Sequence, residues 1–191
     1  MPPISTREFE RVPLRVHSFL AGVRLHDVWA VDLPSTRSGI TLNEFVRATN
    51  ECQLKPSRVV RLLLHTRFFV GRLLGWDREA AENACESFAT RLTNTDRSKS
   101  LVEPGTPEGF FRVVYRFENE QLLEVINRTA HAAAVSALIE EAGKYRFYFA
   151  VYVRKVSWFT PVYMTFIDPF RQLIVYPSLL RTIEKKWSQL P

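Results

Sequence analysis

The chain has 191 residues, of which 46% are hydrophobic, and this is enough apolar material for the core of one domain. It has no N-terminal signal pattern and no apolar run near the roughly 20 residues that a membrane-spanning helix needs, so we expect a cytoplasmic protein. The formal net charge is +6, but the basic excess is spread along the chain around an acidic middle segment, which argues against nucleic-acid binding.

The motifs of common chemistries are missing from the sequence. Cys52 and Cys85 are the only cysteines, and neither has a second cysteine or a histidine at metal-ligand spacing. We therefore expect two plain thiols, no metal and no cofactor. The sequence also lacks a glycine-rich phosphate loop, a Gly-x-Ser-x-Gly turn and a His-Glu-x-x-His motif, which argues against kinases, dinucleotide enzymes and the common hydrolases.

The first part of the chain combines an irregular start with clear local signals. Residues 1–20 contain three prolines among charged residues and are expected to form an N-terminal arm. A strand is predicted over residues 26–33. Thr41 and Glu44 then form a capping box, which predicts a short helix over residues 42–51.

The clearest helix of the sequence is predicted over residues 57–74, and it carries an unexpected charge. In a helical projection Arg67 falls in the middle of the apolar side. It either pairs with a buried carboxylate or reaches the edge of the core, or it faces a cavity that holds a ligand. The opposite side is either an ordinary solvated face or a surface for a partner, and it comprises Arg58, Arg61, His65 and Arg72.

Residues 93–107 are expected to form a loop, and an alternating pattern follows from residue 110 onward. It predicts strands over residues 111–117, 121–127 and 145–156. We also interpret the alanine-rich residues 129–141 as a strand, because they lie between two strands and end in a short turn.

Two side chains of these strands are candidates for a functional role. His131 shares a face with apolar neighbours, so it is either a core histidine with satisfied hydrogen bonds or a ligand-facing side chain. Tyr148 lies on the face of its strand opposite to Tyr145 and Phe147 and is a further candidate.

The C-terminal part is predicted to be helical. Thr160–Pro161 and Asp168–Pro169 both have the pattern of an N-cap residue followed by a proline in the first helical position. The amphipathic stretch after Pro169 is long enough to cross a sheet, and we expect Pro177 to kink it. Asp168 is then a helix cap or, alternatively, an acid in a site.

Three segments resemble a bacterial family that is catalogued as domain of unknown function 2867. They are FRVVYRFENE at 111–120, TAHA at 129–132 and YMTFIDPFR at 163–171, and the resemblance covers roughly His26 to Trp187. The family is grouped with the START/birch-allergen-like helix-grip superfamily (SRPBCC). The resemblance implies an α+β domain over residues 21–191, in which a curved antiparallel sheet wraps around a long C-terminal helix. It further implies a cavity between the sheet and the C-terminal helix. The element order predicted from the residues, with two helices inserted after the first strand, is compatible with this fold.

From this fold we expect a binding module for a small, largely apolar or amphipathic ligand, with Arg67 as an anchor for an anionic group. The candidate cavity residues are Arg67, Glu118, His131, Tyr148 and Asp168. One alternative is a cavity enzyme of the cyclase or hydrolase type, in which Arg67, Glu118, His131 or Asp168 acts as acid or base. Another alternative is a partner or nucleic-acid binder that uses its basic surface.

Overall fold

The computed structural model describes residues 3–34, 38–51, 86–126, 131–141, 143–156 and 160–188. The predicted helix over residues 57–74, with Arg67 and the basic side opposite to it, lies outside these ranges, as do both cysteines. Within the described ranges, no helix combines the length and the apolar character that a membrane crossing requires.

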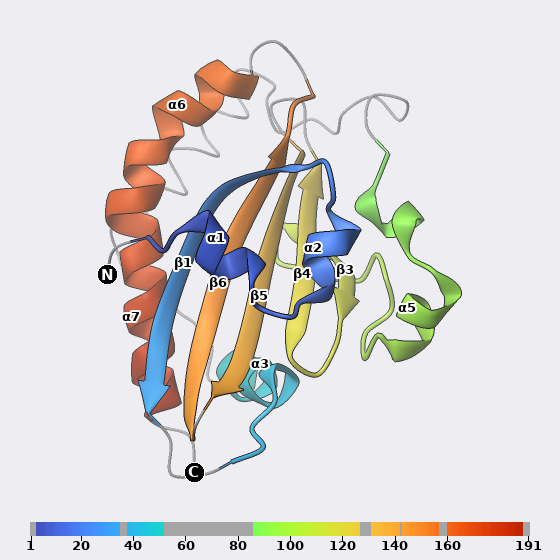
Figure 1. Cartoon of the computed structure of the whole chain (residues 1–191). Helices are drawn as coiled ribbons and strands as arrows, with labels where there is room; N and C mark the ends of the chain where they lie inside the picture. The colour runs from blue at the N-terminus through green and yellow to red at the C-terminus, as the bar shows by residue number, and fades with distance from the viewer. Residues whose placement is uncertain are drawn as a thin grey trace.

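A curved antiparallel sheet forms the centre of the fold (Figure 1). Among the described residues it has six strands in the order β1-β6-β5-β4-β3-β2. Their bounds are β1 Arg24–Pro34, β2 Pro107–Glu108, β3 Phe111–Arg116, β4 Glu120–Ile126, β5 His131–Glu141 and β6 Lys144–Arg154. The prediction of an α+β chain with an antiparallel sheet is therefore confirmed.

The alanine-rich segment is a strand despite the helix propensity of alanine. As β5 it pairs with β6 from His131–Arg154 to Glu141–Lys144, and with β4 on its other edge. Ladder hydrogen bonds on both edges and buried small side chains such as Ala133 outweigh the local preference for a helix.

One face of the sheet is covered by α3 and by the C-terminal helices. These are α3 Leu42–Glu51, α6 Thr160–Phe170, the π-helical turn η2 Arg171–Val175 and α7 Tyr176–Trp187. Figure 1 shows α6 and α7 running along the edge of the sheet beside β1. Alternate residues of β1, such as Trp29 and Leu33, pack towards these helices, and so do Tyr145 and Phe147 of β6.

In the described part of the chain, the other face is covered by four short helices. They are α1 Thr6–Glu10, α2 Arg15–Phe19, η1 Phe88–Arg91 and α5 Asn94–Lys99. The segment that we expected to be an arm thus contains two helices, and Phe9 and Val16 within it are fully buried. The segment that we expected to be a loop contains α5, which begins at a capping box made by Thr93 and Asp96.

The structure corrects the prediction for Asp168. It lies inside α6, which continues through Pro169, so it is not the N-cap of a new helix. A proline inside a helix removes one backbone donor and crowds the carbonyl four residues earlier, yet the helix continues here through Phe170 into the following turn. The interruption lies instead at η2, directly before Tyr176 and Pro177 begin α7. Pro177 has no N–H for the carbonyl four residues earlier, and the wider π turn accommodates this.

Candidate functional site

A group of polar side chains lies between β1 and the C-terminal helices, and we call it the polar centre. It comprises His26, Asp27, Asp168, Arg171 and Tyr176. A β-bulge sets its sheet side, because Leu25 pairs with Tyr152 while Asp27 pairs with Val151, which leaves His26 as the extra residue. Both His26 and Asp27 consequently reach side chains of the helix.

Arg171 connects the two sides of the polar centre. Its guanidinium donates to Asp168 at 3.0 Å and to Asp27 at 3.1 Å, and it also donates to the hydroxyl of Tyr176. The other oxygen of Asp168 lies 2.9 Å from Nε2 of His26. Arg171 is the first residue of the π turn, a local structure that is frequent at functional sites.

The polar centre is largely buried and carries an excess of acid. The side chains of Asp27, Arg171, His26 and Asp168 are 9%, 16%, 18% and 21% exposed. Two carboxylates face one guanidinium, so the formal charge is negative whenever His26 is neutral. Burial raises the pKa of Tyr176 well above its ordinary value, so its hydroxyl stays protonated at neutral pH.

The donor atoms of His26, Asp27 and Asp168 lie within 4.8 Å of one another. One imidazole and two carboxylates form a set that suits divalent transition metals. Arg171 already bonds both carboxylates, however, so a cation here would have to displace its guanidinium from Asp27. The arrangement fits an ion-paired centre better than a preformed metal site.

Trp29 adds an unusual feature beside the polar centre. It lies two residues after Asp27 on the same side of β1, is 4% exposed, and packs against Tyr176 with ring centroids 5.6 Å apart. Its indole N–H is buried and has no acceptor among the residues that the structure describes. The indole of Trp187, by contrast, donates to the carbonyl of Pro34 at 2.6 Å. A buried donor without an acceptor costs about 1–3 kcal/mol, so the state of Trp29 calls for an explanation.

A family model described as "Protein of unknown function (DUF2867)" matches residues 19–178. The chain belongs to this family. No curated protein and no solved structure matches it significantly. The matched range includes Trp29 and every residue of the polar centre.

Within this DUF2867 domain, the candidate residues from the sequence lie at separate places. Glu118 is exposed in the turn between β3 and β4, where its backbone carbonyl accepts from the N–H of Asn43. Tyr148 is buried on the sheet face opposite to the C-terminal helices, against Phe9 of α1. Asp168 is the described candidate that belongs to the polar centre, and Arg67 lies outside the described residues.

His131 is a core residue with a satisfied partner. It is fully buried, stacks on Phe88 with centroids 3.9 Å apart, and has its Nε2 atom 2.9 Å from Glu124. Burial alone would raise the pKa of Glu124, but hydrogen bonds from His131, the Ser87 hydroxyl and the Phe88 amide together lower it. Glu118, His131 and Asp168 are therefore not brought together, so they do not form one catalytic group.

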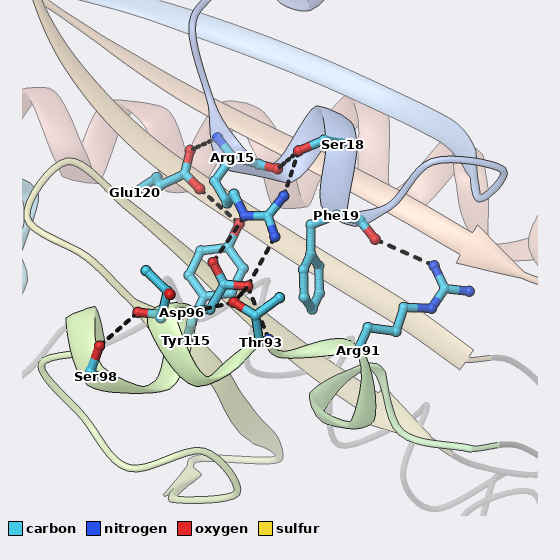
Figure 2. Close-up of polar contacts among 10 residues, drawn as sticks. Arg15, Ser18, Phe19, Arg91, Thr93, Asp96, Ser98, Tyr115 and Glu120 are labelled. Atoms are coloured by element: carbon cyan, nitrogen blue, oxygen red, sulfur yellow. Dashed lines mark hydrogen bonds and ion pairs between the residues drawn. The ribbon is translucent and has the colours of Figure 1, made fainter.

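A second polar cluster lies on the opposite side of the sheet (Figure 2). The Arg15 guanidinium donates twice to Asp96, at 3.0 and 2.9 Å, and the backbone N–H of Arg15 donates to Glu120 at 2.8 Å. The hydroxyl of Tyr115 donates to the other oxygen of Glu120 at 2.8 Å. The residues of this cluster come from α2, α5, β3 and β4, so we interpret the cluster as a structural one that holds these elements of the DUF2867 fold together.

Sequence reasoning missed most of the polar centre. One available signal was the spacing of Asp168 and Arg171, which places them on the same side of a helix once the helix is taken through Pro169. The contribution of His26 and Asp27 depends on the bulge, which has no mark in the sequence. The unpaired state of Trp29 depends on packing between distant segments of this DUF2867 chain.

Proposed function

We propose that this DUF2867 protein is a binding module for a small, largely apolar ligand that carries a hydrogen-bond acceptor. The ligand is held between the sheet and the C-terminal helices, beside the polar centre. The observation that carries the proposal is the buried N–H of Trp29, which a ligand oxygen would satisfy. Sites of this kind are mostly apolar, with a few polar groups that fix orientation.

The surroundings of Trp29 suit the apolar part of such a ligand. The rings of Trp29 and Phe149 both lie against Tyr176, with centroids 5.6 and 5.5 Å away. Ile167, Val175 and Leu179 of the C-terminal helices are only partly buried against the same core. The helix-grip fold implied by the sequence resemblance also places its ligand between the sheet and the C-terminal helix, which supports this location.

The other functions that we considered have less support. The enzyme alternative needs at least two of its candidates at one place. Glu118, His131 and Asp168 lie apart, and Arg67 lies outside the described ranges. The basic-surface alternative rests on residues 57–74, which lie outside the described ranges. We therefore retain the binding module as the function to test.

The test compares two tryptophan replacements. The probe is dodecan-1-ol, which has a flexible apolar chain and one oxygen, and uptake is measured by native mass spectrometry and by thermal shift. We expect wild-type protein to bind it one to one and Trp29→Phe to bind about tenfold more weakly, because one hydrogen bond of about 1.4 kcal/mol is lost. Trp29→Phe should fold nearly as well as wild type, because removing a donor that has no acceptor among the described residues offsets part of the packing that the smaller ring loses.

Trp187→Phe is the matched control. It removes an indole that is paired with Pro34 in the same core, so it should lower the unfolding temperature and leave probe affinity unchanged. No uptake by the wild type, or equal uptake by both variants, would refute the proposal.

A further inference from the structure

The charge balance of the polar centre bears on the chemistry of the ligand. We infer that the polar end of the ligand is an uncharged oxygen group, such as a hydroxyl or a carbonyl, and is neither a carboxylate nor an ammonium group. This inference rests on the proposed function and narrows it to one class of ligand.

The first step concerns the positive charge. Sites that bind anions offer the guanidinium fork of an arginine to the ligand. In the polar centre that fork is occupied, because one terminal nitrogen of Arg171 bonds Asp168 and the other bonds both Asp27 and Tyr176. With both terminal nitrogens already bonded, Arg171 has no free pair of terminal N–H groups to offer an incoming carboxylate.

The second step concerns the negative charge. With His26 neutral, the charges of Asp27 and Asp168 outnumber that of Arg171, and the two aspartate side chains are 9% and 21% exposed. At such burial the effective dielectric constant is lower than in water, so like charges repel more strongly. An anionic ligand would therefore lose its hydration and would also be repelled by the two aspartates.

The third step concerns the donor that the site leaves free. The indole N–H of Trp29 is neutral, buried and unpaired among the described residues. A hydroxyl or carbonyl oxygen accepts from it at little cost. An ammonium group would be attracted by Asp27 and Asp168, but it has no lone pair to accept with and so leaves the Trp29 N–H unpaired. An uncharged oxygen therefore satisfies Trp29 and avoids repulsion by Asp27 and Asp168.

The test is a series of three probes with the same chain, which are dodecan-1-ol, dodecanoate and dodecylamine. Affinities are measured by titration calorimetry at neutral pH and below the concentrations at which the probes aggregate. We expect the alcohol to bind at least about tenfold more tightly than either charged probe. Tighter binding of dodecanoate would overturn the inference and favour an anionic anchor such as Arg67, and tighter binding of the amine would also overturn it. Binding of none of the three would instead refute the proposed function itself.

Two variants separate the local charge from the overall charge. Asp168→Asn removes one negative charge and turns the ion pair with Arg171 into a weaker, neutral hydrogen bond, so the preference for alcohol over dodecanoate should shrink to a few-fold. Asp32→Asn changes the net charge by the same amount, but at a side chain of β1 that is 76% exposed and lies outside the polar centre. Its preference should equal that of the wild type, and an equal change in both variants would contradict the role of the polar centre.

Discussion

The side chain of Arg15 connects α2 to α5 through an ion pair with Asp96. Its guanidinium is 35% exposed, whereas the carboxylate of Asp96 is 8% exposed and also accepts from Thr93. The hydrogen bonds from Arg15 hold the pKa of Asp96 well below its ordinary value. Because the folded-state pKa is the lower one, the pair stabilises the fold above the ordinary aspartate pKa and loses this effect as the pH falls.

We predict that Asp96→Asn lowers the free energy of unfolding by about 1–2 kcal/mol at neutral pH, a modest value because Arg15 remains partly solvated. The variant should also lose less stability than the wild type when the pH falls below about 4. Urea unfolding at neutral pH and below about pH 4 measures both changes in the free energy of unfolding. Asp32→Asn is the control, with a change within about 0.5 kcal/mol, and an unaltered acid response in Asp96→Asn would contradict the assignment.

At the scale of elements, α2 depends on a residue that is far away in sequence. Its N-cap position holds Leu14, which makes no side-chain hydrogen bond to the helix. Glu120 of β4 supplies the acceptor instead, for the first N–H of α2 at Arg15. Burial raises the pKa of Glu120 above its ordinary value, because the effect of burial is larger than that of the hydrogen bonds that favour the ionised carboxylate. Stability is therefore lost as the pH rises from the ordinary glutamate pKa through the raised one.

Two replacements of Glu120 test this interpretation. Glu120→Gln keeps an acceptor for α2 without the charge, so its thermal stability should fall less than that of the wild type between about pH 4 and pH 8. Glu120→Ala removes the cap and should cost about 1–2 kcal/mol at neutral pH. A glutamine variant with the full pH response of the wild type would show that another group causes it.

The elements also show what sequence patterns can and cannot predict. The alternation in residues 145–156 correctly placed Tyr145 and Phe147 on one face of β6, and the capping box at Thr41 correctly began α3, with the N–H of Glu44 3.1 Å from the Thr41 hydroxyl. Both signals are local. The N-cap rule failed at Asp168 because the same Asp-Pro pattern also occurs inside a helix, and α6 continues through the exposed Pro169 to Phe170.

The site was less predictable than the fold for a similar reason. Asp168 and Arg171 lay within a recognised run of sequence, but their partners His26 and Asp27 come from a strand more than a hundred residues earlier. The bulge that turns those side chains towards the helix is a property of the pairing between β1 and β6. Hydrophobic periodicity contains no information about such a pairing.

At the scale of the whole molecule, the sheet is covered on both faces, and the N-terminal helices contribute to one of the two cores. Phe9 is fully buried there and contacts His17 and Tyr148, with ring centroids 4.9 and 5.9 Å away. We predict that Phe9→Ala lowers the free energy of unfolding by about 3–5 kcal/mol. Phe110→Ala, at a side chain that is 56% exposed, should cost far less. Denaturant unfolding measures both, and equal small effects would contradict a structural role for α1.

The central claim is that a ligand oxygen accepts from Trp29 between the sheet and the C-terminal helices. The most direct measurement follows the indole N–H resonances of ¹⁵N-labelled protein during titration with dodecan-1-ol, with the signals assigned through Trp29→Phe and Trp187→Phe. The claim predicts that the Trp29 indole proton moves downfield to saturation, because it gains an acceptor, while the Trp187 signal, already paired with Pro34, stays in place. A Trp29 signal that does not move while the probe binds would contradict the claim.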